Sequence, residues 1–137
     1  MENFMANSNV WKKITNQRTE ILEYLQTTKD HPTASKIYIE IKNKLPRISL
    51  STVYRTLEEL QRQNLVRAIY LGKEILYETN FQDHLDFYCI SCRRVFDIPA
   101  VEIIDIKRRL ENSDYKTEEN QFIIKGICPV CQKLGHK

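Results

Sequence analysis

The sequence predicts an α+β protein in two parts. An N-terminal winged helix-turn-helix domain is expected over residues 1–74 and a small C-terminal α/β domain over residues 75–137. Three observations predict this arrangement. Three segments carry apolar residues at helical spacing, a two-stranded pattern around a glycine follows them, and all four cysteines lie in the C-terminal half as two CxxC pairs.

The length and composition suit a soluble globular protein. At 137 residues the chain has room for one ordinary domain or two small ones, each with a modest core. No apolar run approaches the roughly 20 residues that a membrane helix needs. The N-terminal segment MENFMANSNVWKK lacks the charged start and apolar middle of a secretory signal. A cytoplasmic protein is therefore expected.

The first two helices are expected in the segments ITNQRTEILEYLQ and HPTASKIYIEIKNKLP. Apolar residues share one helical face in each segment. Thr15 or Asn16 is the expected cap of the first helix, since a hydroxyl or amide oxygen can accept from the first free backbone N–H groups. Pro46 would end the second helix.

The third helix, in SLSTVYRTLEELQRQN, is expected to begin at a Ser49 cap. Its apolar face should bury Leu50, Val53, Leu57 and Leu60. The segment LVRAIYLGKEILYET then indicates two short strands around a turn at Gly72. Two short helices, a third helix and a hairpin together describe a winged helix-turn-helix.

The outer face of the third helix mixes the side-chain types of a major-groove reader. It carries Ser51, Thr52, Tyr54, Arg55 and Arg62. Residues 1–70 hold eleven Lys and Arg against seven Asp and Glu, whereas residues 71–137 hold ten against eleven, so a polyanion would be drawn to the N-terminal half. An ordinary amphipathic helix with a solvated polar face stays an alternative.

The cysteines form the pairs Cys89-Ile-Ser-Cys92 and Cys128-Pro-Val-Cys131, with thirty-five residues between them. In a reducing cytosol two matched CxxC pairs favour a tetrahedral zinc site over disulfides, because each pair presents two sulfurs from one tight turn. Four thiolates leave zinc no open position, so the site should fold the domain rather than catalyse. A redox dithiol and buried free thiols are the alternatives.

In combination these motifs resemble the ferric uptake regulators, a family of dimeric, metal-dependent bacterial repressors. The resemblance covers nearly the whole chain. It rests on TNQR at 15–18, HPTASKIY at 31–38, SLSTVYRTLEEL at 49–60, the DH before the first CxxC and the second CxxC near the C-terminus. It implies a winged-helix DNA-binding domain, a short hinge and an α/β dimerisation domain, with duplex operator DNA and a second copy of the chain as partners and no enzymatic activity.

The resemblance also implies the roles of particular residues. Cys89, Cys92, Cys128 and Cys131 match the structural zinc ligands of many members. Tyr54 matches a residue that the family uses against bases, and Arg55 one used against phosphate or a groove edge. Ser51, Thr52 and Arg18 are further candidate DNA contacts.

A second, regulatory metal sits between the two domains in this family. Its ligands map to His31, Glu78, His84, Asp86 and Asp97. Asp86 stands where most members have histidine, which gives two imidazoles and three carboxylates. Oxygen-rich sites suit Mn²⁺ and Fe²⁺ better than Zn²⁺, so a zinc-uptake regulator is ranked low.

Two branches of the family remain close. Peroxide-sensing members typically have aspartate at the position of Asp97, whereas iron-uptake regulators typically have glutamate there; Glu78 is the iron-regulator choice. His31 and His84 correspond to the histidines that iron-bound peroxide sensors oxidise. An additional site of many iron regulators maps to Asp83, Leu85, Ile104 and Asn120, of which three are poor ligands. A peroxide sensor is therefore expected, with an iron-responsive repressor of iron uptake genes as the alternative.

Other interpretations of these candidate ligands are open. Taken singly, His31 before Pro32 could be a turn residue, and Asp97 could cap a helix beginning near Val101. The acids Glu78, Asp83 and Asp86 read as exposed hairpin residues. Functions from other classes are a metalloenzyme at the two histidines, for which no nucleophile–base pair is evident, and a zinc-stapled adaptor that binds protein through its winged helix.

Overall fold

The computed structural model describes residues 9–118 and 121–135 and divides into two compact units, the first ending at Asn80 and the second beginning at Phe81. The first unit contains α1 (Asn9–Thr27), α2 (Ala34–Ile41), α3 (Leu50–Arg62), β1 (Arg67–Leu71) and β2 (Glu74–Glu78). The second contains β3 (His84–Cys89), β4 (Val95–Pro99), α4 (Glu102–Asn112), β5 (Ile123–Gly126) and α5 (Pro129–Lys133). None of the helices in these ranges combines the length and the apolar composition of a membrane span.

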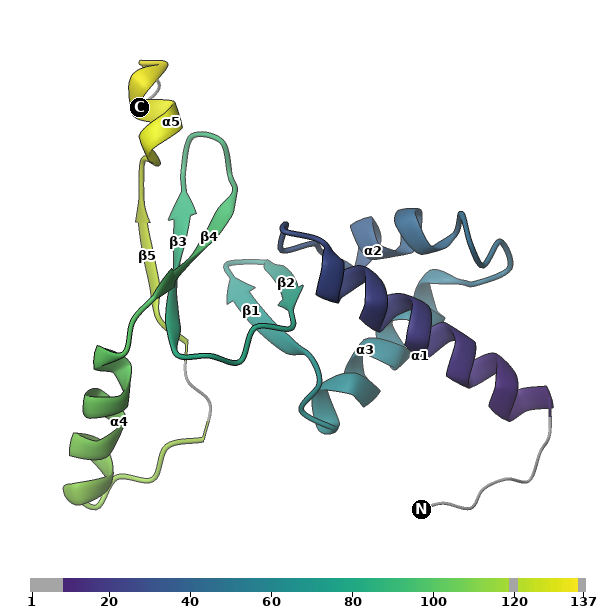
Figure 1. Ribbon diagram of the computed structural model, residues 1–137, viewed down its shortest axis with the longest axis horizontal. Helices are drawn as coiled ribbons and strands as arrows, with labels where there is room; N and C mark the ends of the chain where they lie inside the picture. Colours follow the sequence, from purple (N-terminus) through teal and green to yellow (C-terminus); the bar gives the residue numbers. More distant parts are fainter. Residues whose placement is uncertain (1–8, 119–120, 136–137) are drawn as a thin grey trace. The chain divides into compact units, whose positions relative to one another are not determined.

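In the first unit, three helices precede an antiparallel hairpin (Figure 1). The helix α1 begins at Asn9, so Thr15 and Asn16 lie inside it and the predicted cap is wrong. The physical reason is that the residues before Thr15 contain neither glycine nor proline to stop the helix.

The caps of the next two helices follow from their hydroxyl side chains. Thr33 Oγ1 accepts from the Lys36 backbone N–H at 3.2 Å, and Ser49 Oγ accepts from the Thr52 N–H at 3.2 Å. The predicted Ser49 cap is confirmed. Leu50, however, is 37% exposed rather than buried, because it is the first residue of α3 and precedes the turn that packs inward.

The core of the first unit is built from the inner faces of all three helices and from the hairpin. Its buried members are Ile21, Leu25, Ala34, Ile37, Ile41, Ile48, Val53, Leu57, Leu60, Val66 and Tyr77. Burial of this apolar face supplies most of the stabilisation of short helices, which are marginal alone. It also leaves the opposite face of α3 available to solvent.

The hairpin pairs β1 with β2 from Arg67 opposite Glu78 to Leu71 opposite Glu74. Gly72 has a φ of +63°, a left-handed conformation that favours glycine, and the predicted turn there is confirmed. Since β2 pairs along its whole length with β1, the first unit includes the strand as far as Glu78.

The second unit is a three-stranded sheet in which β3 lies between β4 and β5 (Figure 1). β3 runs antiparallel to β4 and parallel to β5. The register sets Asp86 opposite Asp97 and Cys89 opposite Gly126. The apolar core near the cysteines is small, with Phe87, Phe96 and Ile127 packed against them.

Candidate metal centres and nucleic-acid surface

The four cysteines meet at one end of the second unit. Cys89 ends β3, Cys128 caps α5 and Cys131 lies within it. All four are free thiols, and their Sγ atoms lie within 4.8 Å of one another, with Cys92 and Cys128 at 4.0 Å. A tetrahedral zinc with Zn–S bonds of about 2.3 Å separates its sulfurs by roughly 3.8 Å. The cluster therefore fits such an ion.

The thiols of this cluster differ in how easily they ionise. Burial alone would raise the pKa of Cys89, but backbone N–H groups, including those of Cys92 and Cys128 at 3.4 Å from its sulfur, lower it to about 6. Burial raises the pKa of Cys131 to about 12. The Cys89 thiolate thus forms readily, and its negative charge disfavours ionisation of the neighbouring thiols. Holding four thiolates together therefore calls for a multivalent cation.

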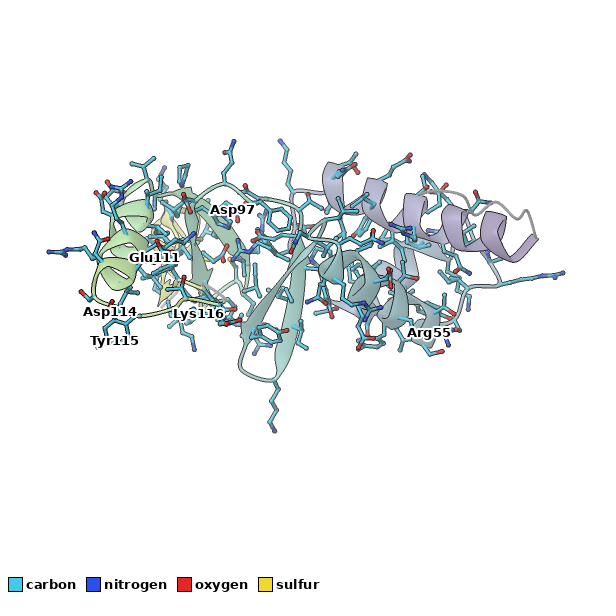
Figure 2. The ribbon with its side chains drawn as sticks, turned by 90° about the horizontal axis from the view of Figure 1, so that it is seen from below. Arg55, Asp97, Glu111, Asp114, Tyr115 and Lys116 are labelled. Atoms are coloured by element: carbon cyan, nitrogen blue, oxygen red, sulfur yellow. The ribbon has the colours of Figure 1, made fainter. Side chains whose placement is uncertain are left out.

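A second group of ligand-type side chains lies on β3 and β4. His84 and Asp86 are 2% and 1% exposed, and His84 Nε2 lies 3.3 Å from Asp86 Oδ1 and 3.6 Å from Asp97 Oδ1. The side chain of Asp97, labelled in Figure 2, is 31% exposed. The reading of Asp86 as an exposed acid is therefore wrong. Asp97 also does not cap α4, whose N-cap residue is Val101.

The orientation of the His84 ring has a chemical consequence. Its Nδ1 lies 2.6 Å from the backbone oxygen of Gln82, and a carbonyl can only accept, so Nδ1 carries the hydrogen. Nε2 then turns its lone pair toward the carboxylates of Asp86 and Asp97. That contact is favourable only when Nε2 carries a cation, either a proton or a metal ion. The donor set thus fits a divalent cation.

The first unit holds its own pair of candidate ligands. His31 lies in the loop before α2 and Glu78 at the end of β2, with His31 Nε2 and Glu78 Oε1 at 3.2 Å. Their side chains are 7% and 5% exposed, so Glu78 is not an exposed hairpin acid. The Tyr77 N–H donates to the Pro32 carbonyl at 2.9 Å, which holds this loop against β2.

Glu78 also has a partner that the sequence did not indicate. Arg67 Nη1 donates to Glu78 Oε2 at 2.6 Å and lies 3.4 Å from the Asn80 carbonyl. The two charged residues are eleven positions apart and meet because the hairpin register sets them opposite each other. The sequence signal that could have predicted this pair is the position of Gly72, because counting outward from a turn there sets Arg67 opposite Glu78.

The candidate DNA-contact residues of α3 lie on its outer face. Ser51, Tyr54 and Arg55 are exposed, Tyr54 at 46%, and Thr52 is half-buried. Arg55 projects from α3 (Figure 2), and its Nη2 donates to Thr52 Oγ1 at 3.2 Å.

Three other positions from the sequence have different surroundings. Arg18 is half-buried on α1 and donates to the Gln63 side chain just after α3. Asp83 accepts from Lys107 Nζ at 3.0 Å, so its carboxylate is engaged by an ammonium group. Asn120 lies outside the residues that the structure describes.

Comparisons with known proteins agree with this arrangement. The profile of the Ferric uptake regulator family matches residues 9–125. The chain is 26% identical over 126 residues to the peroxide-responsive repressor PerR of Staphylococcus epidermidis, covering 90% of this chain and 84% of that one. With the PerR of Staphylococcus aureus strain USA300 the identity is 29% over 122 residues, covering 88% and 82%.

Solved structures give the same result. The peroxide stress regulator of Campylobacter jejuni superposes with a TM-score of 0.78 at 26% identity, over 96% of this chain and all of that one. The Helicobacter pylori ferric uptake regulator Fur, at 22% identity, shares the fold with a TM-score of 0.71 over 90% and 89% of the two chains. Because the family profile spans most of the sequence, the chain belongs to the ferric uptake regulator family.

Proposed function

We propose that the protein is a metal-dependent, DNA-binding transcriptional repressor that responds to peroxide through Fe²⁺ or Mn²⁺ at a regulatory site. The observation that carries the proposal is the group of His84, Asp86 and Asp97, in which Nε2 of a buried imidazole faces two carboxylate oxygens at 3.3 and 3.6 Å. The similarity to proteins named peroxide-responsive repressors, over more than four fifths of the chain, supports the same branch.

The first unit is proposed to be the winged-helix DNA-binding domain, with β1 and β2 as the wing. Support comes from the division of α3 into a buried apolar face and an outer face with Ser51, Thr52, Tyr54 and Arg55. Hydroxyls and an aromatic ring suit base edges, and a guanidinium suits phosphate or guanine. Arg18 would contact phosphate only if it exchanged its bond to Gln63 for one to DNA.

The cysteine cluster is proposed to hold structural Zn²⁺ in the second unit. Its four sulfurs fit a tetrahedron, and the surrounding apolar core is too small to stabilise a unit of this size alone. The energy of zinc binding would therefore be folding energy. A zinc ion bound there would help to hold β3, which carries His84 and Asp86, beside β5.

The regulatory site is proposed to take His31 and Glu78 from the first unit and His84, Asp86 and Asp97 from the second. Each unit has an incomplete, buried set of ligand atoms. A cation that binds both sets would favour one arrangement of the two units over others, by as much as its affinities for the arrangements differ. That difference is what would couple metal to DNA affinity.

A homodimer is the proposed assembly. The second unit exposes apolar side chains on α4, on the residue before it and on the strands β4 and β5: Ile98 at 43%, Val101 at 70%, Ile104 at 43%, Leu110 at 37% and Ile124 at 52%. Apolar surface of this kind typically marks an interface between proteins. A two-fold pair would present two copies of α3 to successive major grooves.

The test that separates peroxide sensing from iron regulation is chemical. The zinc-loaded protein is supplied with Fe²⁺, treated with peroxide and digested for mass spectrometry. The proposal expects one added oxygen atom on His31 or His84 together with loss of duplex binding, and a Mn²⁺-loaded sample should stay unmodified. Unmodified histidines and unchanged binding after peroxide would instead favour an iron-responsive repressor.

A further inference from the structure

Arg67 is a charged residue in direct contact with a proposed regulatory ligand, Glu78. Its guanidinium donates to Glu78 Oε2 at 2.6 Å, while the other oxygen, Oε1, lies 3.2 Å from His31 Nε2. Arg67 is 21% exposed and Glu78 5%, so water screens this ion pair only in part. The two oxygens of one carboxylate are thus divided between a permanent cation and the proposed metal position.

We propose that Arg67 is a built-in competitor for Glu78 and thereby sets the affinity of the regulatory site for divalent cations. The inference rests on the proposed function, because it takes Glu78 as a ligand. A guanidinium stays protonated at any physiological pH, so it withdraws charge from the carboxylate permanently. With Oε2 held by Arg67, Glu78 offers the metal a single oxygen rather than two.

Two effects of Arg67 oppose each other, and their sizes decide the direction. Holding Glu78 in one rotamer favours metal binding, but burial and the backbone of β2 already restrict that side chain, so this gain is small. Repulsion between a guanidinium and a divalent ion that share one carboxylate is several times the thermal energy, even at an effective dielectric constant of about 20. Removal of the charge should therefore strengthen metal binding.

This competition has a functional consequence. A site weakened by an internal cation stays empty until Mn²⁺ or Fe²⁺ is plentiful, and it releases its ion readily. Arg67 would then lower the metal affinity of the site by acting on the metal through Glu78. It would contribute without contacting either the ion or DNA.

The test measures metal affinity directly. Zinc-loaded full-length protein is titrated with Mn²⁺, and free Mn²⁺ is followed by electron paramagnetic resonance. Arg67→Gln and Arg67→Met, two neutral variants of which the second keeps the apolar stem, should bind Mn²⁺ at least about tenfold more tightly than the wild type. Arg67→Lys keeps the charge and should stay within about threefold. Arg47→Gln removes an exposed charge of the same unit and serves as the matched control.

The outcomes separate this inference from the proposed function. Unchanged or weaker Mn²⁺ binding in both neutral variants, with native circular dichroism and full zinc content, would overturn the role of Arg67 and leave it a brace of the hairpin. If Glu78→Gln leaves the wild-type Mn²⁺ affinity unaltered, or if no Mn²⁺ binds, the regulatory site itself is refuted. Tighter Mn²⁺ binding in Arg67→Gln and Arg67→Met, without a comparable change in Arg67→Lys or Arg47→Gln, would support competition for Glu78.

Discussion

A side chain at Gly126 should be destabilising, because this residue packs against an aromatic ring beside the cysteine cluster. A Cβ added at Gly126 would lie 2.9 Å from Phe87 Cζ and 3.2 Å from Cε1. The backbone cannot yield easily, since the Gly126 carbonyl accepts from the Ile90 N–H at 2.8 Å and Cys128 follows two residues later. The Phe87 ring must move instead, and that ring packs against the cysteines.

Overpacking of this kind typically costs about 1–3 kcal/mol of unfolding free energy. Gly126→Ala should therefore destabilise the second unit by that amount and speed the loss of zinc to a chelator. Gly72→Ala is the matched control in the first unit. It meets no atom within 4 Å, and its cost of about 1 kcal/mol comes from its positive φ alone.

Urea unfolding of the zinc-loaded protein and a colorimetric assay of zinc release would measure both variants. Gly72→Ala should leave the release rate unchanged. Adding Phe87→Leu to Gly126→Ala should restore part of the lost stability, because the smaller side chain makes room for the Cβ. A Gly126→Ala protein with wild-type stability and zinc retention would refute this account of the packing.

Three further predictions concern the ends and the outer face of the helices. Ser49→Ala should cost about 1 kcal/mol in unfolding free energy and Ser49→Asp much less, because only alanine removes the acceptor for the Thr52 N–H; equal losses would contradict the cap. Asp114→Gly should raise the thermal midpoint and add about 0.5–1 kcal/mol to the unfolding free energy, because Asp114 has a φ of +68° just after the C-terminal end of α4 (Figure 2). A lower midpoint would contradict backbone strain at this residue. Arg55→Ala should weaken duplex binding, measured by fluorescence anisotropy, and reduce the slope of log affinity against log salt by about one, with zinc content unchanged; loss of zinc together with binding would indicate a folding defect instead.

The elements of the fold could be predicted because they depend on local patterns. Helical spacing predicted α2 and α3, the hydroxyl of Ser49 predicted a cap, and Gly72 predicted the hairpin turn. The start of α1 was missed because two cap-forming residues, Thr15 and Asn16, precede its clearest apolar repeat but lie within the helix. A residue of this type caps a helix only where its own backbone and the residues before it are not helical.

The candidate site was predictable only as a set of residue types. Spacing and resemblance predicted that His84, Asp86 and Asp97 act together, but the burial of His84 and Asp86 and their closeness to Asp97 depend on the pairing of β3 with β4. The bond from His84 Nδ1 to the Gln82 carbonyl depends on a backbone conformation that no motif specifies. The ion pair of Arg67 with Glu78 likewise depends on the register of the hairpin formed by β1 and β2.

The most direct test of the central claim is the dependence of DNA affinity on the regulatory cation. Zinc-loaded protein is titrated, with and without Mn²⁺, against a duplex that the protein has selected from a randomised pool, and binding is followed by fluorescence anisotropy. Mn²⁺ should tighten binding by about tenfold or more, and His84→Ala should lose this response while keeping its zinc. Equal affinity with and without Mn²⁺ in a folded, zinc-loaded wild type would contradict the claim.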